Sequence, residues 1–302
     1  MLLIMGCTAG GKSKVAFELA QRLDGEILSV DSMKVYRRMD IGTAKPPADQ
    51  REKIRHHLID VVEPEESFSL GRFLELANNT ITQVRDAGRT LIAAGGTGMY
   101  LRGLLEGMFE GPGADPDIRL RLAGEAKKNG LNILHTRLQK IDPLAAQRIH
   151  PHDEKRIVRA LEVYELTGKP ISSFHTQFRS GEYQYPWLII ELARTKEDCN
   201  RRINARAKRM IDDGLVDEVT GLVAGAIGLQ ASQAVGYAEI IAYLQGDFVL
   251  DEAIEQIKIN TRRLAKSQRT WFRGFGDVYR LDITENDTVE EVADRLFSEF
   301  SL

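Results

Sequence analysis

Short apolar runs alternate with longer amphipathic stretches along most of the chain. The longer stretches predict helices over 12–23, over 70–86 with Ser69 as N-cap, and over 196–212. Buried strands that alternate with helices are typical of a parallel sheet covered on both faces. The apolar runs that predict its strands span 2–5, 26–30, 57–61, 90–94, 187–193 and 278–282. We therefore expect an α/β fold.

The alternation stops between residues 116 and 183. There the pattern predicts three or four helices and no strand, between the turn-rich strings GPGADPD and SGEYQYP. From Arg119 to Arg159 this segment holds ten Lys and Arg against four acids, a local charge of +6. We expect a basic helical insertion domain over 116–183 in a core formed by 1–115 and 184–302, the second part of which carries C-terminal helices.

The composition limits the function classes. Lys and Arg number 41 and Asp and Glu number 44, so the net charge of -3 excludes a globally basic nucleic-acid binder but leaves local patches possible. Residues 201–209 hold five basic groups, and Arg262, Lys266, Arg269 and Arg273 step along one helical face. No apolar run reaches the ~18–20 residues that cross a bilayer. The two cysteines imply neither a disulfide framework nor a zinc cluster. We expect a cytoplasmic monomer.

The string GCTAGGKS at 6–13 matches the Walker A pattern of a P-loop. An apolar strand precedes it and a helical pattern follows, which is the context that the motif requires. Its residues would cradle a diphosphate or the phosphates of a nucleotide such as ATP, with Lys12 at the terminal phosphates and the Ser13 hydroxyl on Mg²⁺. The predicted phosphate-binding residues are Gly6, Cys7, Thr8, Ala9, Gly10, Gly11, Lys12 and Ser13.

Two further polar groups follow predicted strands. Asp31 comes directly after the second strand and fits a metal ligand, a general base or a helix cap. Thr97 lies in the string GGTG after the fourth strand, where glycines allow close backbone approach. His56 and His57 point to opposite sides of a strand, so we interpret them as structural.

Several longer strings resemble the tRNA dimethylallyltransferases, also called tRNA isopentenyltransferases, over nearly the whole chain. In order they are GCTAGGKS, SVDSMKVYRRMDIGTAKP, HHLID, GGTGMYLRGLLEG, RIHPHDEKRIVRALEVYELTGKP, AVGYAEI and TRRLAKSQRTWFRGF. The resemblance implies a P-loop core with a helical insertion that grips tRNA. It also implies transfer of a dimethylallyl group from its diphosphate to the exocyclic amine of the adenosine immediately 3′ to the anticodon. The tRNAs concerned read codons that start with U.

The resemblance also implies roles for particular residues. Asp31 would accept or hold the amine proton, Thr97 would orient the amine, and Arg206 would add a cation for the diphosphate. The implied tRNA contacts are Asp31, Ser32, Met33, Lys34, Thr97, Arg119, Lys155, Arg156, Ile157, Val158, Arg159, Gln233, Ala234, Val235, Gly236, Tyr237 and Ala238. The chain departs from the family pattern at Cys7, Gly10 and Ser13, at Lys34, where the family often has Gln, and at Ser267.

Three alternatives remain open on the residues alone. A small-molecule or nucleotide kinase would also use a Walker A loop, an acid-tipped second strand and a basic lid. An isopentenyltransferase that acts on free adenine nucleotides would share the loop without needing a basic insertion. A nucleotide-gated RNA-binding module would bind RNA without turnover.

Overall fold

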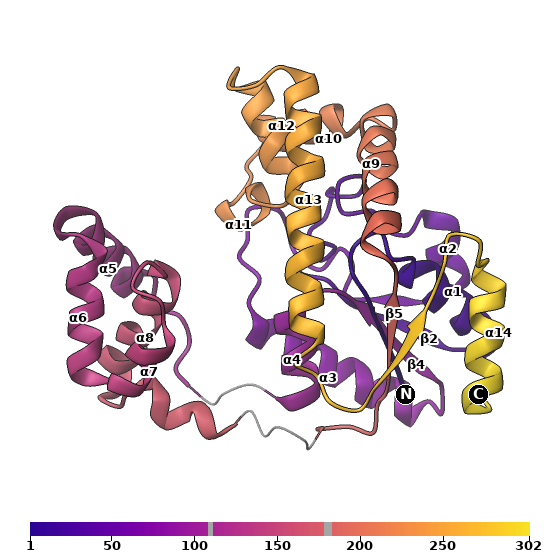
Figure 1. The fold of residues 1–302 in the computed structure, drawn as a ribbon, viewed down its shortest axis with the longest axis horizontal. Coiled ribbons are helices and arrows are strands. Elements are labelled where there is room, and N and C mark those ends of the chain that lie inside the picture. The colour runs from indigo at the N-terminus through magenta and orange to yellow at the C-terminus, as the bar shows by residue number, and fades with distance from the viewer. Residues whose placement is uncertain (108–110, 178–182) are drawn as a thin grey trace. The chain divides into compact units, whose positions relative to one another are not determined.

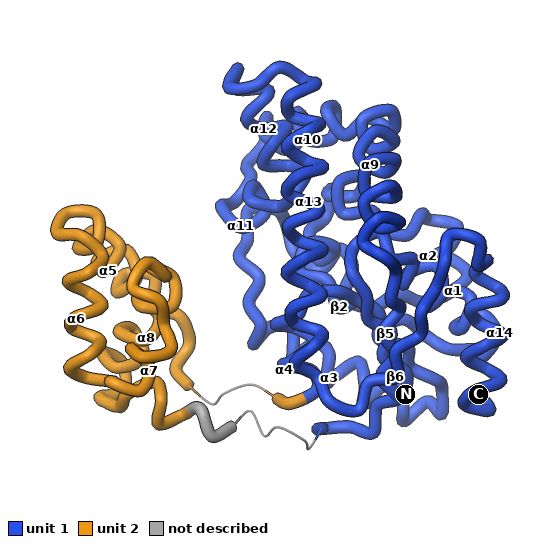
Figure 2. The backbone as a smooth tube through the Cα atoms, in the orientation of Figure 1, with its two compact units in different colours: residues 1–105, 183–302 blue, residues 106–182 orange. Residues whose placement is uncertain are grey.

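The chain forms two compact units in the computed structural model, which describes residues 1–107, 111–177 and 183–302. The first unit contains residues 1–105 and 183–302, and the second contains residues 106–182 (Figure 2).

A parallel sheet forms the centre of the first unit (Figure 1). Its register pairs Met5 and Val30 with the same residue, Gly95. Every strand pair runs parallel, which confirms the predicted fold class. In spatial order the strands are β3 (His56–His57), β2 (Glu26–Val30), β4 (Leu91–Gly95), β1 (Leu2–Met5), β5 (Leu188–Ala193) and β6 (Val278–Asp282).

Helices cover both faces of this sheet because successive strand residues point to opposite sides. Leu2 and Ile4 pack under α1 (Lys12–Arg22) and α14 (Val289–Phe300). Leu3 and Met5 belong to the larger core on the other face. The remaining helices of this unit are α2 (Ala48–Lys53), α3 (Leu70–Asp86), α4 (Gly98–Glu106), α9 (Lys196–Asp212), α10 (Leu215–Ala224), α11 (Leu229–Ser232), α12 (Tyr237–Leu244) and α13 (Leu250–Phe272).

The predicted strand over 57–61 is wrong beyond His57. Pairing with β2 stops there because Leu58 and Asp60 adopt left-handed backbone conformations, with φ of 61° and 56°. The Asp60 carboxylate is held at 2.5 Å from Lys45 Nζ and 2.6 Å from Arg51 Nη1. These ion pairs fix a turn where the apolar pattern alone favours a strand. The other predicted strands agree with the structure to within one residue at each end.

The second unit is helical and has a core of its own. Its helices are α5 (Pro116–Asn129), α6 (Leu131–Ile141), α7 (Pro143–Arg148) and α8 (Glu154–Thr167), followed by the 3₁₀ helix η1 (Ile171–Gln177). Leu122, Leu134 and Leu161 are fully buried among these helices. Asp115, Asp142 and Asp153 cap α5, α7 and α8 by accepting backbone N–H groups.

A buried carboxylate organises the charges of this unit. Glu162 on α8 is inaccessible to solvent and accepts hydrogen bonds from Arg119 Nε at 2.8 Å and Arg159 Nη1 at 2.7 Å. The backbone amide of Asp115 donates to the same group at 2.7 Å. Burial opposes ionisation of Glu162, but the hydrogen bonds from the two arginines outweigh it and lower its pKa.

We expect Glu162→Gln to destabilise the second unit by about 3–5 kcal/mol, because two partly desolvated guanidinium groups lose their counter-charge. Amide hydrogen exchange in peptides from 115–165 should accelerate, while exchange in 1–105 stays unchanged. The matched control is Glu165→Gln, because Glu165 lies on the same helix and is also paired with two arginines. The Glu165 side chain is 18% exposed, against 0% for Glu162. Equal acceleration in the two variants would contradict the central role of Glu162.

Candidate active site

Three neighbouring strand ends meet at one edge of the sheet. β2, β4 and β1 are adjacent and parallel, so the segments that leave their carboxyl ends lie together. These segments are the one beginning at Asp31, the Gly96–Thr97 turn and the phosphate loop at 6–13. The fold therefore brings Asp31 and Thr97 to the phosphate loop, as the order of strands requires.

The phosphate loop ends in a left-handed residue at the start of α1. Gly11 caps this helix with φ of 96°, a conformation that favours glycine. Two arginines hold the outer carbonyl groups of the loop: Arg202 Nε donates to Ala9 O at 2.8 Å, and Arg194 Nε donates to Gly10 O at 3.1 Å. The segment around α9 thus anchors the loop.

Cations outnumber acids at this edge. Burial lowers the pKa of Lys12, whose Nζ lies 3.5 Å from Cys7 O, and Asp31 acts in the opposite direction. Burial also lowers the pKa of Arg206 and takes the pKa of Lys34 to about 8, again against the attraction of Asp31. Three cations therefore surround one carboxylate. A desolvated surplus of positive charge of this kind favours a multiply charged anion.

Asp31 keeps one carboxylate oxygen free of protein hydrogen bonds. Its Oδ1 accepts the amides of Met33 at 2.9 Å and Lys34 at 3.3 Å, while Oδ2 has no hydrogen-bond partner within the described ranges. Thr97 Oγ1 accepts the amide of Ser32 at 3.1 Å, which links the two turns. The carboxylate is thus fixed in orientation and has an acceptor available for a ligand.

Gln268 on α13 joins the phosphate loop to the Thr97 turn. Its Oε1 accepts the amide of Thr8 at 2.7 Å, and its Nε2 donates to Gly96 O at 2.9 Å. The side chain is 8% exposed, and a Cβ on Gly96 would lie 2.5 Å from Nε2. Sequence reasoning assigned no role to Gln268. The string TRRLAKSQRTWFRGF around it was the available signal, but its contacts lie 172 and 260 residues away.

Residues 34–275 match the sequence model of the family described as IPP transferase, which is well over half of the chain. The chain belongs to the IPP transferase family. The tRNA dimethylallyltransferase of Geobacter metallireducens is 46% identical over 275 residues, which cover 90% of this chain and 89% of that protein. The tRNA dimethylallyltransferase of Geobacter sulfurreducens is 42% identical over 300 residues, or 98% and 96% of the two chains. The sequence resemblance is therefore confirmed.

Solved structures of related proteins agree with this family membership. The full-length tRNA isopentenylpyrophosphate transferase of Bacillus halodurans is 39% identical, with a TM-score of 0.71 over 99% of this chain and 96% of that one. A eukaryotic dimethylallyltransferase described as acting on tRNA is 27% identical, with a TM-score of 0.84 over 98% of this chain and 77% of that one.

The tRNA-contact residues expected in the second unit of this IPP transferase divide into three groups. Arg119 and Arg159 are bound to Glu162, and Arg159 also donates to the carbonyl groups of Pro112 and Gly113. Ile157 and Val158 are buried in the helical core, so their side chains serve packing. Lys155 and Arg156 are exposed.

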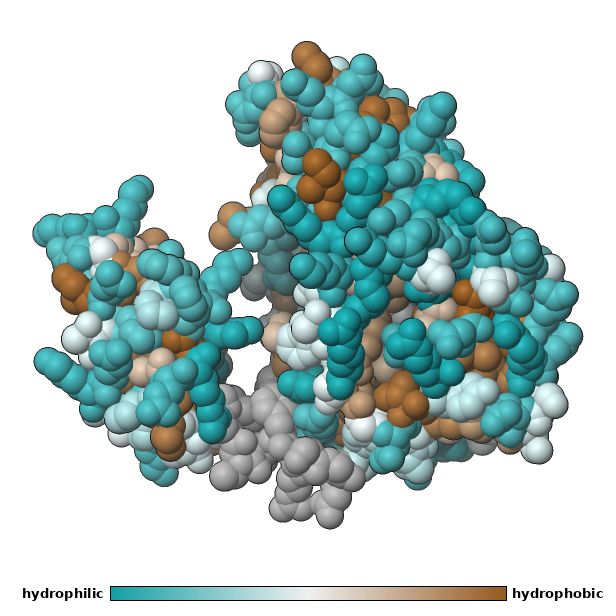
Figure 3. All heavy atoms as spheres, in the orientation of Figure 1, coloured by the Kyte–Doolittle hydropathy of each residue, from teal (hydrophilic) through white to brown (hydrophobic). Residues whose placement is uncertain are grey.

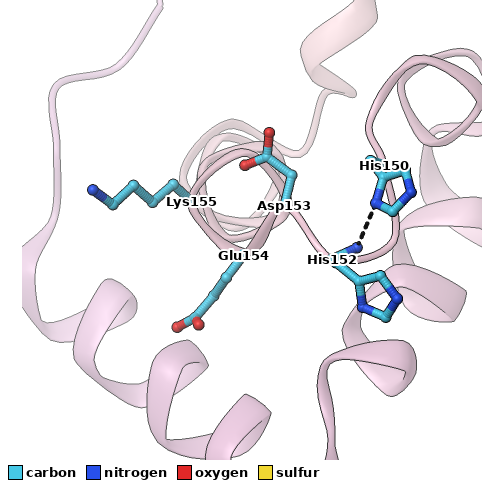
Figure 4. Close-up of a pocket in the computed structure, with 5 residues that line it drawn as sticks. All are labelled: His150, His152, Asp153, Glu154 and Lys155. Atoms are coloured by element: carbon cyan, nitrogen blue, oxygen red, sulfur yellow. Dashed lines mark hydrogen bonds between the residues drawn. The ribbon is translucent and has the colours of Figure 1, made fainter. Parts of the chain in front are cut away.

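A hollow lies at the start of α8, and Lys155 is one of the residues that line it (Figure 4). The amide of His152 donates to His150 Nδ1 at 3.2 Å, and the Asp153 carboxylate accepts the amide of Arg156. The hollow is lined by His150, His152, Asp153, Glu154 and Lys155. It presents polar side chains at the start of α8.

The expected contact segment at 233–238 is partly structural. Tyr237 is buried and its hydroxyl donates to Glu218 Oε1 at 2.5 Å. Glu218 in turn accepts the amides of Asp40, Ile41 and Gly42. Ala234 and Gly236 are also buried, which leaves the surface to Gln233, Val235 and Ala238. A tRNA contact was expected for Tyr237, and its buried side chain supports the 40–42 turn through Glu218.

The basic residues expected on one face of 262–273 divide into two that contact other parts of the first unit and two that are exposed. Arg262 Nη2 donates to Asn204 Oδ1 on α9 at 2.5 Å, and Arg269 is partly buried close to Cys7. Lys266 and Arg273 are exposed. Figure 3 shows hydrophilic side chains gathered over α13 and α9 on the visible face. Among the described residues, no helix has the length and apolar character needed to span a membrane.

We expect Gln268→Leu to weaken binding of inorganic pyrophosphate by about tenfold or more. The Thr8 amide and the Gly96 carbonyl would lose their partners, each at a cost of about 1–3 kcal/mol, and the loop would no longer be held to the Thr97 turn. Isothermal titration calorimetry measures this affinity.

The chain offers a matched control for Gln268. Gln230 likewise bridges a backbone amide and a carbonyl, both of Phe68, at 3.0 Å each and away from the phosphate loop. Gln230→Leu should lower thermal stability and leave pyrophosphate affinity intact. If both variants bind pyrophosphate as the wild type does, Gln268 does not position the loop.

Proposed function

We propose that this IPP transferase moves a dimethylallyl group from dimethylallyl diphosphate to tRNA. The acceptor is the exocyclic amine of the adenosine immediately 3′ to the anticodon in tRNAs that read codons starting with U. The names of the relatives support this function. The structural observation that carries it is the surplus of partly buried cations around Asp31 at a phosphate loop.

The diphosphate is bound by the phosphate loop and its neighbouring cations. Lys12 and Arg206 neutralise the charge that develops as the allylic carbon–oxygen bond breaks. Ser13 is exposed at the start of α1, and its hydroxyl makes no hydrogen bond to the part of the chain that the structure describes. It is therefore free to hold Mg²⁺, which would supply further charge neutralisation on the diphosphate.

The acceptor amine is held between Asp31 and Thr97. An adenine amine is a weak nucleophile because its lone pair is delocalised into the ring. The free Oδ2 of Asp31 accepts a hydrogen bond or the proton from this amine, and Thr97 orients it. The adenosine has to leave the stacked anticodon loop to reach this edge of the sheet.

Exposed groups on both units bind the tRNA. Lys155 and Arg156 contact phosphates from the second unit, and the surface at Gln233, Val235 and Ala238 contacts the anticodon stem-loop. Ser32, Met33 and Lys34 lie beside Asp31 and contact the entering nucleotide. We propose that the protein acts as a monomer in the cytoplasm, where tRNA is used.

Incubation with labelled dimethylallyl diphosphate and total tRNA, followed by nucleoside analysis, tests the function. We expect label in the adenosine next to the anticodon and none in free AMP. Label in AMP alone would favour the free-nucleotide transferase. ATP consumption with a small-molecule acceptor would favour a kinase.

We expect Asp31→Asn and Asp31→Ala to lower turnover by about 10²-fold or more, with a smaller effect on tRNA affinity. The asparagine keeps the oxygen that accepts the amides of Met33 and Lys34, so it preserves the turn while removing the base. Single-turnover kinetics and tRNA binding measure the two effects. An active Asp31→Asn beside an inactive Asp31→Ala would reduce Asp31 to a turn former.

We expect the double variant Lys155→Gln, Arg156→Gln to weaken tRNA binding and flatten its salt dependence. Each lost phosphate contact should reduce the slope of log affinity against log salt by about 0.7–0.9. Arg159 is left in place because it is bound to Glu162.

The control for this pair is Lys127→Gln, Lys128→Gln, which makes the same charge change at exposed positions on α5. Affinity for dimethylallyl diphosphate should be equal in all three proteins. Identical slopes for the two double variants would show a general charge effect in place of a phosphate contact.

A further inference from the structure

The two cysteines of this chain lie against one another inside the phosphate-loop region. Cys7 belongs to the loop and Cys199 to the first turn of α9, and their Sγ atoms are 3.2 Å apart with one thiol donating to the other. They are 4% and 0% exposed and pack in a small apolar cluster with Ile203 and Ala265. Both are free thiols. They are the only cysteines in the sequence, so neither can form a disulfide with any other residue of the chain.

We propose that Cys7 and Cys199 are a reversible oxidation site, whose disulfide disables the phosphate loop. This inference goes beyond the transferase function, since nothing in that reaction uses a thiol. It rests on three observations: the contact between the sulfurs, the cations beside Cys7, and the part that Cys7 plays in the shape of the loop.

The surroundings of the pair give its members different reactivity. The hydrogen bond from Cys199 lowers the pKa of Cys7 to about 6; burial opposes this, and Lys12 and Arg269 reinforce it. The pKa of Cys199 is raised by its hydrogen bond to Cys7 and by burial. The thiolate is the reactive form, and the cations Lys12 and Arg269 beside Cys7 favour it there, so we take Cys7 as the attacking group and Cys199 as the resolving one.

The oxidant is a hydroperoxide, for which hydrogen peroxide is the probe. The Cys7 thiolate attacks one peroxide oxygen, the O–O bond breaks and hydroxide leaves, which gives a sulfenic acid. The Cys199 sulfur then attacks the Cys7 sulfur, the S–O bond breaks and the oxygen leaves as water. The two thiols lose two electrons together, peroxide becomes two water molecules, and the two thiol protons end in that water. A dithiol reductant reverses the reaction by thiol–disulfide exchange.

The disulfide would change the loop because Cys7 shapes it. A disulfide bond is about 2.05 Å long, so the two sulfurs have to approach from 3.2 Å. The carbonyl group of Cys7 accepts the amide of Gly10 at 3.0 Å and the ammonium of Lys12 at 3.5 Å. Movement of Cys7 toward α9 therefore displaces the acceptor that Lys12 and Gly10 share. The crosslink also ties the loop covalently to α9, which limits its adjustment around an anion.

Treatment of the reduced protein with a small excess of hydrogen peroxide tests the proposal. Intact mass should fall by two hydrogen atoms, thiol titration should fall from two groups to none, and peptide mapping should find Cys7 joined to Cys199. Affinity for inorganic pyrophosphate, measured by calorimetry, should fall by about tenfold or more and return after treatment with dithiothreitol.

The matched variant is Cys199→Ala, which removes the resolving thiol and leaves the loop sequence intact. It should bind pyrophosphate as the reduced wild type does, and under peroxide it should gain oxygen or stay unchanged without losing hydrogen. If the alanine variant is unstable, Cys199→Ser replaces it, because serine is closer in size to cysteine and also lacks the thiol.

Three results would overturn the proposal. They are two titratable thiols after oxidation, disulfides only between separate chains, or an internal disulfide that leaves pyrophosphate affinity unchanged. Mass and thiol counts involve neither tRNA nor prenyl transfer, so they stand if the proposed function fails. Absence of pyrophosphate binding by the reduced protein would instead count against the diphosphate site.

Discussion

A single amide side chain satisfies one backbone donor of the phosphate loop and one backbone acceptor of the Thr97 turn. Gln268 reaches both from α13, a helix of 23 residues that comes late in the chain. Strand pairing brings the loop and the turn to the same sheet edge, but only a group that contacts both fixes their separation. The distance between bound diphosphate and acceptor amine in the proposed reaction thus depends on how α13 packs.

Positive charge is concentrated in local clusters, although the net charge of the chain is -3. At the sheet edge, cations exceed the single carboxylate of Asp31, and their partial burial favours an anion as the ligand. In the second unit the excess of basic residues is smaller than the sequence suggests, because Glu162 and Glu165 bind four of the arginines. A basic composition therefore overstates the number of cations available to nucleic acid.

Local sequence was enough to predict the parallel sheet, the phosphate loop and the positions of Asp31 and Thr97 beside it, because each depends on a short motif or on strand order. The turn at Asp60 was missed, since its ion pairs with Lys45 and Arg51 override an apolar pattern. The roles of Gln268 and the contact of Cys7 with Cys199 were also missed. Such contacts join residues between 172 and 260 positions apart, and no periodicity encodes them.

The turn at 40–42 shows how one carboxylate can tie distant positions together. Glu218 accepts three successive backbone amides there and also the hydroxyl of Tyr237, whose ring occupies the space beside Gly42. A Cβ on Gly42 would lie 2.3 Å from that ring. A larger residue at position 42 is compatible only with a smaller one at 237, which would in turn strip Glu218 of a donor. Substitutions at Gly42, Glu218 and Tyr237 are therefore coupled, although the three residues lie on separate segments of the sequence.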